Sequence, residues 1–338
     1  MNYTDVINQN IANHGNWARY AYHYTDIVNA IRILSCGKLY SRKNAIRRGL
    51  MKNDNAGQNV LDHTVDVVKD YVRFYFRPLT PTQFYNEGYK FPDLRFGQNA
   101  NVPLPVFFVF NLEKMLQNPN IRFSATSLAG YSPGSLKRGV DNFSALPFDN
   151  IYSYGFQENR EMVKYRHAEL VCPNEFEVDT CLEKIIFRNE MDLETFKSYS
   201  ALMNDMIGYD KKYFKLMQVE DKSLEVFERN GLFVESVETS RRYKKTYYAG
   251  EYFCVDIKFK FADTPERRYY NSYALRKTSG NPMPIQCRLL ADGKEYFSKI
   301  HYQISVLEFK EILTYNQNLS LWLWIDDCLM LAKNIILI

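Results

Sequence analysis

The sequence predicts an α+β protein in which a mixed N-terminal domain precedes a β-sandwich-like C-terminal domain. The chain opens with a short strand pattern, a helical pattern at 27–34 and a second extended segment. After about residue 208, alternating strand patterns and turn signals dominate. We therefore expect a first domain over 1–208, a charged helical connector over 209–230 and a β-rich domain over 231–338.

The first domain carries clear signals for its elements. Asp26 is placed to cap the helix at 27–34, and Gly37 is placed to end it. Apolar and polar side chains alternate over 72–77, which predicts a strand with one buried face. The remaining patterns predict strands at 20–24, 39–41, 106–110, 121–123, 167–171 and 182–187, a helix at 192–206 and a long mobile loop at 124–160.

The C-terminal part reads as a series of short strands. Residues 253–261 alternate between apolar and charged side chains, and Asp292-Gly293 is a hairpin turn signal. Such strands and turns predict a sandwich of about 110 residues. The apolar stretch at 319–338 contains Asp326, Asp327 and Lys333, so we interpret it as a strand pair and not as a membrane span.

Composition excludes several classes of protein. The 338 residues are 46% hydrophobic, enough for two folded domains, and the formal net charge of +4 demands no nucleic-acid partner by itself. Six cysteines are scattered without zinc spacing, which favours reduced thiols and no bound metal. Residues 1–5 lack the signature of a signal peptide. We therefore expect a cytoplasmic protein without a membrane partner.

Three segments combine reactive side chains with strand patterns. They are Tyr22-His23-Tyr24-Thr25, the stretch 69–78 with Thr80-Pro81 after it, and 166–171. Their order and spacing resemble the DarT family of nucleic-acid-modifying toxins. That family's pattern is an HxT, a DYVxFYFxPxxP strand and an RQAE-like strand that carries the catalytic glutamate. The resemblance extends over roughly residues 18–205.

The resemblance implies an ADP-ribosyltransferase fold, in which two small packed sheets hold NAD in a cleft between them. It implies NAD as co-substrate, with no metal: the N-glycosidic bond to nicotinamide breaks, and a nucleobase nitrogen of single-stranded DNA attacks the ribosyl carbon. It also implies a cognate antitoxin of the ADP-ribosyl hydrolase type, which reverses the modification.

Glu169 matches the catalytic glutamate of this pattern. Glycosidic cleavage passes through an oxocarbenium-like state, which a nearby carboxylate stabilises. The same carboxylate can bond the ribose 2′-hydroxyl and take a proton from the attacking base. On the strand pattern alone, Glu169 would be interpreted as a solvent-facing residue.

The resemblance also implies a set of NAD-binding residues. His23 matches the histidine of the HxT, which fixes the NAD ribose; the expected NAD-binding residues are His23, Tyr24, Thr25, Asn29, Arg42, Tyr71 and Arg73. Many family members grip the NAD phosphates with an arginine before the DYV strand, where this chain has Asp62-His63-Thr64. Arg73, Arg77, Arg42, Arg47 and Arg48 are therefore the candidates for this contact.

A second set of residues is expected to bind the nucleic-acid acceptor. His167 stands where the family pattern has a glutamine that positions the nucleophile. One hypothesis is that the acceptor base differs from that of Gln-bearing relatives, and the alternative is that His167 packs structurally. Arg166 and Tyr154 complete the expected substrate-binding set, Tyr154 as one of several loop aromatics able to stack on a base. Single-stranded DNA is the expected partner. RNA or protein acceptors, or a degenerate binding module, are the alternatives. Residues 241–248 interleave basic and aromatic side chains, either to follow a nucleic-acid backbone or as a basic strand face.

Overall fold

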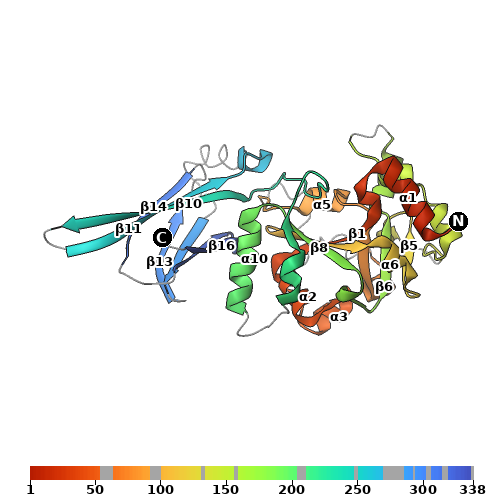
Figure 1. Ribbon diagram of the computed structural model, residues 1–338, viewed down its shortest axis with the longest axis horizontal. Helices are drawn as coiled ribbons and strands as arrows, with labels where there is room; N and C mark the ends of the chain where they lie inside the picture. Colours follow the sequence, from red (N-terminus) through yellow and green to blue (C-terminus); the bar gives the residue numbers. More distant parts are fainter. Residues whose placement is uncertain are drawn as a thin grey trace.

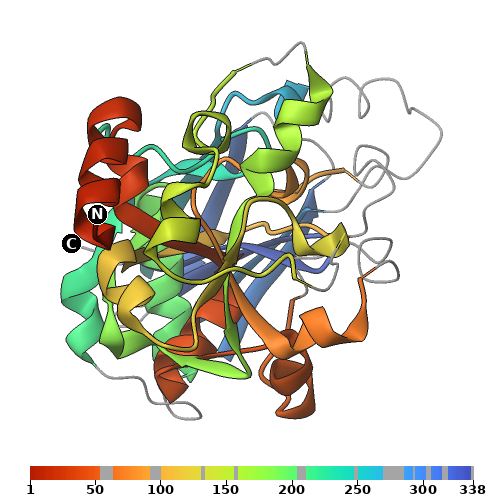
Figure 2. The ribbon, with the colours of Figure 1, turned by 90° about the vertical axis from the view of Figure 1, so that its right-hand side faces the viewer.

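The computed structural model describes residues 1–53, 64–91, 100–130, 134–155, 159–203, 211–246, 250–268, 285–291, 294–301, 306–313 and 319–335. Two bodies of secondary structure lie on either side of helix α10 (Glu190–Met203), with the C-terminal strands on one side and the N-terminus at the far end of the other body (Figure 1). Viewed along the long axis, the C-terminal strands lie behind the first body (Figure 2).

The first body is built on strands, most of them in one sheet. They are β1 (Tyr20–Asp26), β2 (Lys38–Tyr40), β3 (Tyr71–Tyr75), β4 (Pro105–Asn111), β5 (Arg122–Ser124), β6 (Glu169–Pro173), β7 (Glu175–Glu177), β8 (Leu182–Phe187) and β9 (Met217–Val219). Its other helices are α1 (Tyr3–His14), α2 (Ile27–Cys36), α3 (Arg42–Arg47), α5 (Pro81–Asn86), α6 (Leu112–Gln117), α7 (Val140–Ser144), α8 (Phe148–Ile151) and α9 (Arg160–Val163).

The main sheet consists of two halves. Its strand order is β5-β6-β3-β1-β4-β8-β9, and a separate ribbon pairs β2 with β7. Strand β1 pairs with β4 along its whole length, and β3 pairs with β6 in the same way. Within the described chain, β1 and β3 share one register pair, Tyr22 with Tyr75. The sheet therefore opens between β1 and β3, which agrees with the two small sheets and the intervening cleft expected from the sequence.

Helix α2 begins and ends as its sequence predicts. The Asp26 side chain accepts a hydrogen bond from the Val28 amide at 2.9 Å, and Gly37 ends the helix in the left-handed conformation, with φ of 67°. The buried face of α2 packs on one side of the sheet together with residues of α1 and α6. This packing fixes the end of β1, where His23 and Thr25 stand.

The region predicted as a long mobile loop is largely ordered. Residues 124–160 contain α7, α8 and a 3₁₀ turn at Leu128–Gly130, while 131–133 and 156–158 lie outside the described residues. Phe143 and Tyr152 are buried in the main core, so these aromatics anchor the loop and do not face a ligand. Tyr154 differs, because 71% of it is exposed.

The described part of the connector, residues 211–230, contains no α-helix, so the prediction of a helical connector is wrong there. Residues 211–216 form a 3₁₀ turn, β9 joins the main sheet parallel to β8, and the described chain then crosses the sheet without a helix. Leu224, Val226 and Phe227 cover the sheet face that α2 leaves open, against Tyr22 and Phe107. Burial of these three side chains favours an extended path over the helix that the charged composition suggested.

The C-terminal body consists of two sheets that share one core. Strands β10 (Val234–Thr246), β11 (Gly250–Phe261) and β14 (Val306–Leu313) form the first, which extends away from the rest of the molecule (Figure 1). Strands β12 (Ile285–Ala291), β13 (Lys294–His301), β15 (Leu319–Ile325) and β16 (Cys328–Ile335) form the second. Ile257 and Phe259 of one sheet are buried with Leu321 and Leu323 of the other. The predicted sandwich is confirmed, including the turn at Asp326-Asp327.

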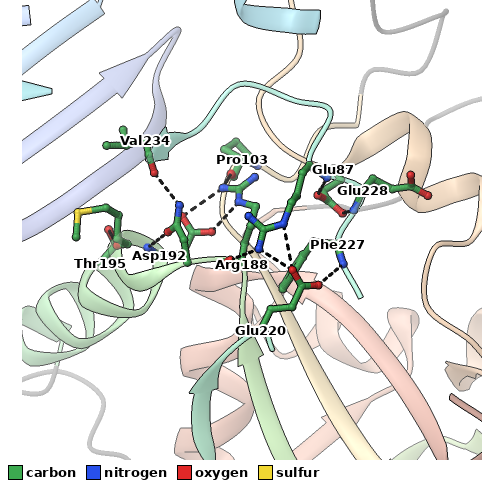
Figure 3. Close-up of polar contacts among 12 residues, drawn as sticks. Glu87, Pro103, Arg188, Asp192, Thr195, Glu220, Phe227, Glu228 and Val234 are labelled. Carbon is green, nitrogen blue, oxygen red and sulfur yellow. Dashed lines mark hydrogen bonds and ion pairs between the residues drawn. The ribbon is translucent and has the colours of Figure 1, made fainter. Parts of the chain in front are cut away.

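A buried network of charges lies beside the junction of the two bodies, and Asn189 joins it to the C-terminal strands by donating to the Val234 carbonyl at 2.9 Å (Figure 3). Arg188 is fully buried; its Nε donates to Asp192 at 2.9 Å, and its Nη2 donates to the Pro103 carbonyl at 3.1 Å. The Glu87 carboxylate accepts the backbone amides of Glu228 at 2.9 Å and Arg229 at 2.8 Å. Since a broken buried ion pair is costly, this network holds the junction in one geometry.

Candidate active site

A cavity of about 570 Å³ opens where β1 and β3 part. Its walls come from β1, α2, β2, α3, β3 and α5, that is, from both halves of the sheet and from the helices beside them. The lining includes every residue that the sequence assigned to NAD: His23, Tyr24, Thr25, Asn29, Arg42, Tyr71 and Arg73. The structure thus brings together residues up to fifty positions apart in the chain.

Glu169 lies at the first position of β6, beside this cavity. Its register partners are Tyr75 on β3 and Ser124 on β5, and its side chain is fully buried. The carboxylate nonetheless accepts three hydrogen bonds from described residues. Arg73 donates from Nε to Oε2 at 2.5 Å and from Nη2 to Oε1, and the Leu128 amide donates to Oε1 at 3.2 Å. Glu169 is therefore a buried, ion-paired carboxylate and not the solvent-facing residue that its strand alone would suggest.

The position of the Arg73 guanidinium does not suit binding to the NAD phosphates. The sequence offered it as one of several arginines for the NAD phosphates. In the structure its Nε and Nη2 both face Glu169. Burial alone would lower the pKa of this guanidinium, but the adjoining Glu169 carboxylate raises it. Arg73 is thus a permanent cation between the cavity and Glu169.

His23 bridges the opening between the two half-sheets. Its Nδ1 donates to the Arg73 carbonyl at 3.0 Å, because a carbonyl can only accept. Burial lowers the pKa of His23, although the bond to the Arg73 carbonyl partly opposes this. The neutral tautomer therefore carries its proton on Nδ1 and leaves Nε2 as an acceptor.

Asn29 and Asp26 organise the rim of the cavity. The Asn29 amide oxygen accepts the Lys52 amide at 2.9 Å, and its nitrogen donates to the Asn53 carbonyl at 2.6 Å. Asp26, outside the described cavity lining, caps the same helix α2, and burial raises its pKa to about 6. Asn29 is therefore committed to shaping the 51–53 segment. Asp62 and His63, at the position of the family's phosphate-binding arginine, lie outside the described residues.

The residues assigned to the nucleic-acid acceptor do not all lie together. His167 lines the cavity two positions before Glu169, and burial lowers its pKa. Arg166 and Tyr154 lie outside the described lining. Arg166 donates to the Ser153 hydroxyl at 3.1 Å and to the Gly155 carbonyl at 2.7 Å, so it supports the loop that presents Tyr154. Tyr154 itself packs edge-on against Trp17, with ring centroids 6.2 Å apart.

Arg77, another phosphate candidate, is turned away from the cavity. It is 1% exposed, stacks on Trp17 at 5.0 Å and donates to the carbonyls of Ile151 and Ser153. Burial lowers its pKa to about 10. Arg77 therefore holds the same loop as Arg166 and is not available to the NAD phosphates.

Sequence reasoning missed some of the cavity's residues. Tyr75 lies on the same strand face as Arg73 and lines the cavity, which the period-two pattern of β3 could have indicated. Thr80 and Gln83 at the start of α5 also line it. The Leu128 amide, which bonds Glu169, leaves no trace in the sequence because any residue type supplies a backbone N–H.

Comparison with known families decides the classification. A family model described as ssDNA thymidine ADP-ribosyltransferase, DarT, matches residues 22–213. This chain belongs to the DarT family. The matched range contains every predicted site residue of the chain, from His23 to Glu169. The C-terminal sandwich lies beyond it, so the DarT assignment covers the first body alone.

Solved DarT structures are similar to part of this chain. Thermus sp. 2.9 DarT in complex with NAD+ is 16% identical, with a TM-score of 0.46, over 61% of this chain and 98% of that chain. The same protein in complex with ADP-ribosylated ssDNA matches with the same identity and TM-score, over 96% of its length. Thermosipho africanus DarTG in complex with ADP-ribose is 17% identical over 54% of this chain and 47% of that chain, with a TM-score of 0.39. A search of curated proteins finds no match.

Two further observations bear on cofactors and membranes. Within the described ranges, no three His, Cys, Asp or Glu side chains gather as a group that could hold a metal ion. None of the described helices is long and apolar enough to cross a membrane.

Proposed function

We propose that this DarT-family chain transfers ADP-ribose from NAD to thymidine in single-stranded DNA and releases nicotinamide. The observation that carries the proposal is the buried Glu169 carboxylate, held by Arg73 beside a cavity that the family's NAD-binding residues line. A buried ion pair adds little stability over apolar side chains of similar size, so the presence of this pair at the edge of a cleft favours a chemical role.

The cavity suits a dinucleotide. Its volume of about 570 Å³ falls within the range of small-molecule sites, and it has both flat aromatic walls and polar groups. Tyr40, Tyr71 and Tyr75 offer ring faces to nicotinamide and adenine, while Nε2 of His23 accepts a ribose hydroxyl. Besides Arg73, the cavity lining has the cationic side chains Arg32, Lys38, Arg42 and Lys69, and Lys38 is paired with Glu175 and Glu177. Arg42, at the start of α3, is our candidate for the phosphate contact.

The reaction follows from these groups. The C–N bond between ribose and nicotinamide breaks, and nicotinamide leaves with the bonding electron pair. Glu169 lies where it can stabilise the oxocarbenium-like carbon and bond the ribose 2′-hydroxyl. Thymidine has one ring nitrogen that bears a proton; as this nitrogen forms the new bond to the ribose carbon, Glu169 takes the proton.

His167 orients the thymine in this proposal. It lines the cavity, and because burial lowers its pKa it is neutral at physiological pH, with one ring donor. That N–H can donate to a thymine carbonyl beside the reacting nitrogen. A glutamine at 167 could do the same, so we expect the variant His167→Gln to keep thymidine as its acceptor, and modification of another base would contradict this.

Modification of thymine at this nitrogen is expected to be toxic. The reacting nitrogen lies on the base-pairing edge, so the adduct prevents pairing and copying of the strand. We therefore propose a toxin that a cognate ADP-ribosyl hydrolase restrains, acting in the cytoplasm, where thiols such as the buried Cys172 and Cys181 stay reduced. The division into a catalytic domain over 1–208 and a sandwich over 231–338 is part of the same proposal.

The proposal is tested by label transfer from NAD. Purified protein is incubated with NAD labelled in the adenine moiety and with single-stranded DNA containing thymidine, the same strand without thymidine, or RNA. The expected result is labelling of the thymidine-containing DNA alone, reduced at least about 1,000-fold in Glu169→Gln. Glu161→Gln, on the surface helix α9, is the matched control and should behave as wild type. Transfer by Glu169→Gln at the wild-type rate, or labelling of RNA alone, would overturn the proposal.

A further inference from the structure

We infer that Arg73 is a positioning residue that sets the geometry of both Glu169 and His23, and that it does not bind the NAD phosphates. The inference rests on the proposed function, because Glu169 and His23 are the groups it positions. Position 73 is the unspecified residue of the DYVxFYF pattern, so the family's motif gives no reason to expect an arginine there.

The carboxylate contacts support this role. A carboxylate offers about four lone-pair positions. Donors among the described residues occupy Oε1 twice, from Arg73 Nη2 and the Leu128 amide, and Oε2 once, from Arg73 Nε. Oε2 therefore accepts fewer hydrogen bonds than Oε1. The ribose hydroxyl therefore reaches Oε2, while Arg73 and Leu128 keep Oε1 in place.

The backbone carbonyl of Arg73 contacts His23. The Arg73 carbonyl accepts from Nδ1 of His23 at 3.0 Å, across the opening between β1 and β3. One residue thus joins the histidine of one half-sheet to the glutamate of the other. Its own backbone is fixed by the ladder between β3 and β6, in which Arg73 stands opposite Val171 and Tyr75 stands opposite Glu169.

A phosphate-binding role would need a free guanidinium edge. The Nε–Nη2 edge, which forms two-point contacts with carboxylates and phosphates, already faces Glu169. The Arg73 side chain is 29% exposed, while that of Glu169 is 1% exposed. Turning the edge toward a phosphate would leave a buried carboxylate without its cation, which is unfavourable. The geometry therefore favours a constant partner of Glu169.

The test separates catalysis from NAD binding. Arg73→Lys keeps the positive charge but can hold only one oxygen well, and Arg73→Ala removes the contact. We expect kcat to fall about 100-fold in Arg73→Ala and by an intermediate factor in Arg73→Lys, because misplaced catalytic groups cost about this much. The Kd for NAD, measured by direct titration, should change less than about threefold in both variants.

The matched control is Arg122→Ala. Arg122 also stands opposite Val171, on the other side of β6, but its guanidinium donates to the Pro119 and Ile121 carbonyls. It should keep the wild-type kcat and Kd. Should Arg73→Ala fail to fold, shown by a lost thermal transition, Arg73→Lys carries the test alone.

Each outcome bears on the inference separately from the proposed function. A Kd for NAD raised tenfold or more with an unchanged kcat at saturating NAD would show a phosphate contact and overturn the inference. An unchanged kcat and Kd in Arg73→Lys and Arg73→Ala would overturn it as well. Nicotinamide release is measured without DNA in parallel. If wild type releases nicotinamide but labels no DNA, the DNA acceptor is wrong, and the same variants still test Arg73 through the hydrolysis rate.

Discussion

The His23 imidazole donates from Nδ1 to the Arg73 carbonyl at 3.0 Å, across the gap between two strands that otherwise meet at one register pair. The bond fixes the tautomer, since a carbonyl can only accept, and leaves Nε2 as the acceptor that the proposed NAD-binding role needs. The ring also packs near Phe74 and Phe108, with centroids 6.0 and 6.3 Å away. A backbone contact and two aromatic side chains thus set the direction of the imidazole.

Replacing His23 by alanine should weaken NAD binding more than it slows the chemical step. Loss of one hydrogen bond to a ribose hydroxyl costs about 1 kcal/mol, or roughly fivefold in KM, and loss of the bridge to Arg73 adds to this. Steady-state kinetics with varied NAD measures the effect. His14→Ala is the control, because His14 contacts Asp149 and Tyr152 and is not part of the described cavity lining. A His23→Ala variant with wild-type KM for NAD would exclude His23 from the binding site.

Asp26→Asn should stabilise the protein at neutral pH. Burial raises the Asp26 pKa from 3.8 to about 6. Between these values the folded state binds more protons than the unfolded state, so this group's contribution to stability is complete below about pH 3.8 and lost as pH rises through about 6. The loss amounts to about 3 kcal/mol above pH 6. Asparagine stays neutral and still offers an oxygen to the Val28 amide.

The measurement is the difference in thermal unfolding between wild type and Asp26→Asn from pH 4.5 to 8. The advantage of the variant should grow up to about pH 6 and then stay level. Asp66→Asn is the control of opposite sign, since the bond to Lys69 lowers the pKa of that exposed carboxyl. A difference that shrinks as pH rises would show that Asp26 is stabilised as a carboxylate.

How much of this could be read from the sequence depends on the range of the interaction. The cap of α2 by Asp26, its end at Gly37 and the alternating faces of β3 are local patterns, and the sequence predicts them correctly. The proposed roles of Glu169 and His23 come from a motif and not from a local pattern. The contact between Arg73 and Glu169 joins residues 96 positions apart and depends on the register of β3 with β6, which no local pattern sets.

The charged composition of the connector led to the wrong prediction of a helix there. Its charged residues favour a helix when considered alone, but Leu224, Val226 and Phe227 are more stable packed on Tyr22 and Phe107. Glu220 then uses its carboxylate to accept the Val226 and Phe227 amides, which replaces the hydrogen bonds that a helix would have supplied. Tertiary burial decides the path of the chain here, and burial is not visible before the sheet exists.

The junction between the two bodies should not tolerate a side chain at Gly88 or Gly231. A Cβ at 231 would lie 2.5 Å from the Glu87 carbonyl oxygen, and a Cβ at 88 would lie 2.7 Å from the Gly231 Cα. Gly231→Ala should therefore destabilise by about 1–3 kcal/mol through overpacking. Gly88→Ala should destabilise further, because Gly88 also has a positive φ of 72°.

Gly49→Ala separates these two causes. Gly49 has a φ of 66° but nothing within 4 Å of an added Cβ, so its variant reports the backbone strain alone, about 1–2 kcal/mol. Thermal unfolding followed by circular dichroism measures how strongly each of the three glycine variants is destabilised. If Gly88→Ala is no more destabilising than Gly49→Ala, the result would contradict a close approach of the two backbones at Gly88 and Gly231.

Tyr154→Ala should impair DNA use without affecting the fold. The ring is 71% exposed, while Arg77 and Arg166 hold the loop through the Ile151, Ser153 and Gly155 carbonyls, so the loop keeps its shape without the tyrosine. Stacking of a base on an aromatic ring contributes about 1–3 kcal/mol, which corresponds to a rise of roughly 5- to 150-fold in KM for single-stranded DNA. Tyr154→Phe keeps the ring and should retain most of the affinity.

The control for Tyr154 is Tyr243→Ala, an equally simple truncation of a tyrosine that is 51% exposed on β10, in the sheet that extends away from the first body. If the active site alone binds the acceptor strand, only Tyr154→Ala raises the KM for DNA, and the KM for NAD stays constant in both variants. An equal rise in the two variants would instead indicate that the DNA also contacts the C-terminal sheet. No rise in Tyr154→Ala would remove Tyr154 from the acceptor site, because a stacked base cannot lose its platform without a loss of affinity.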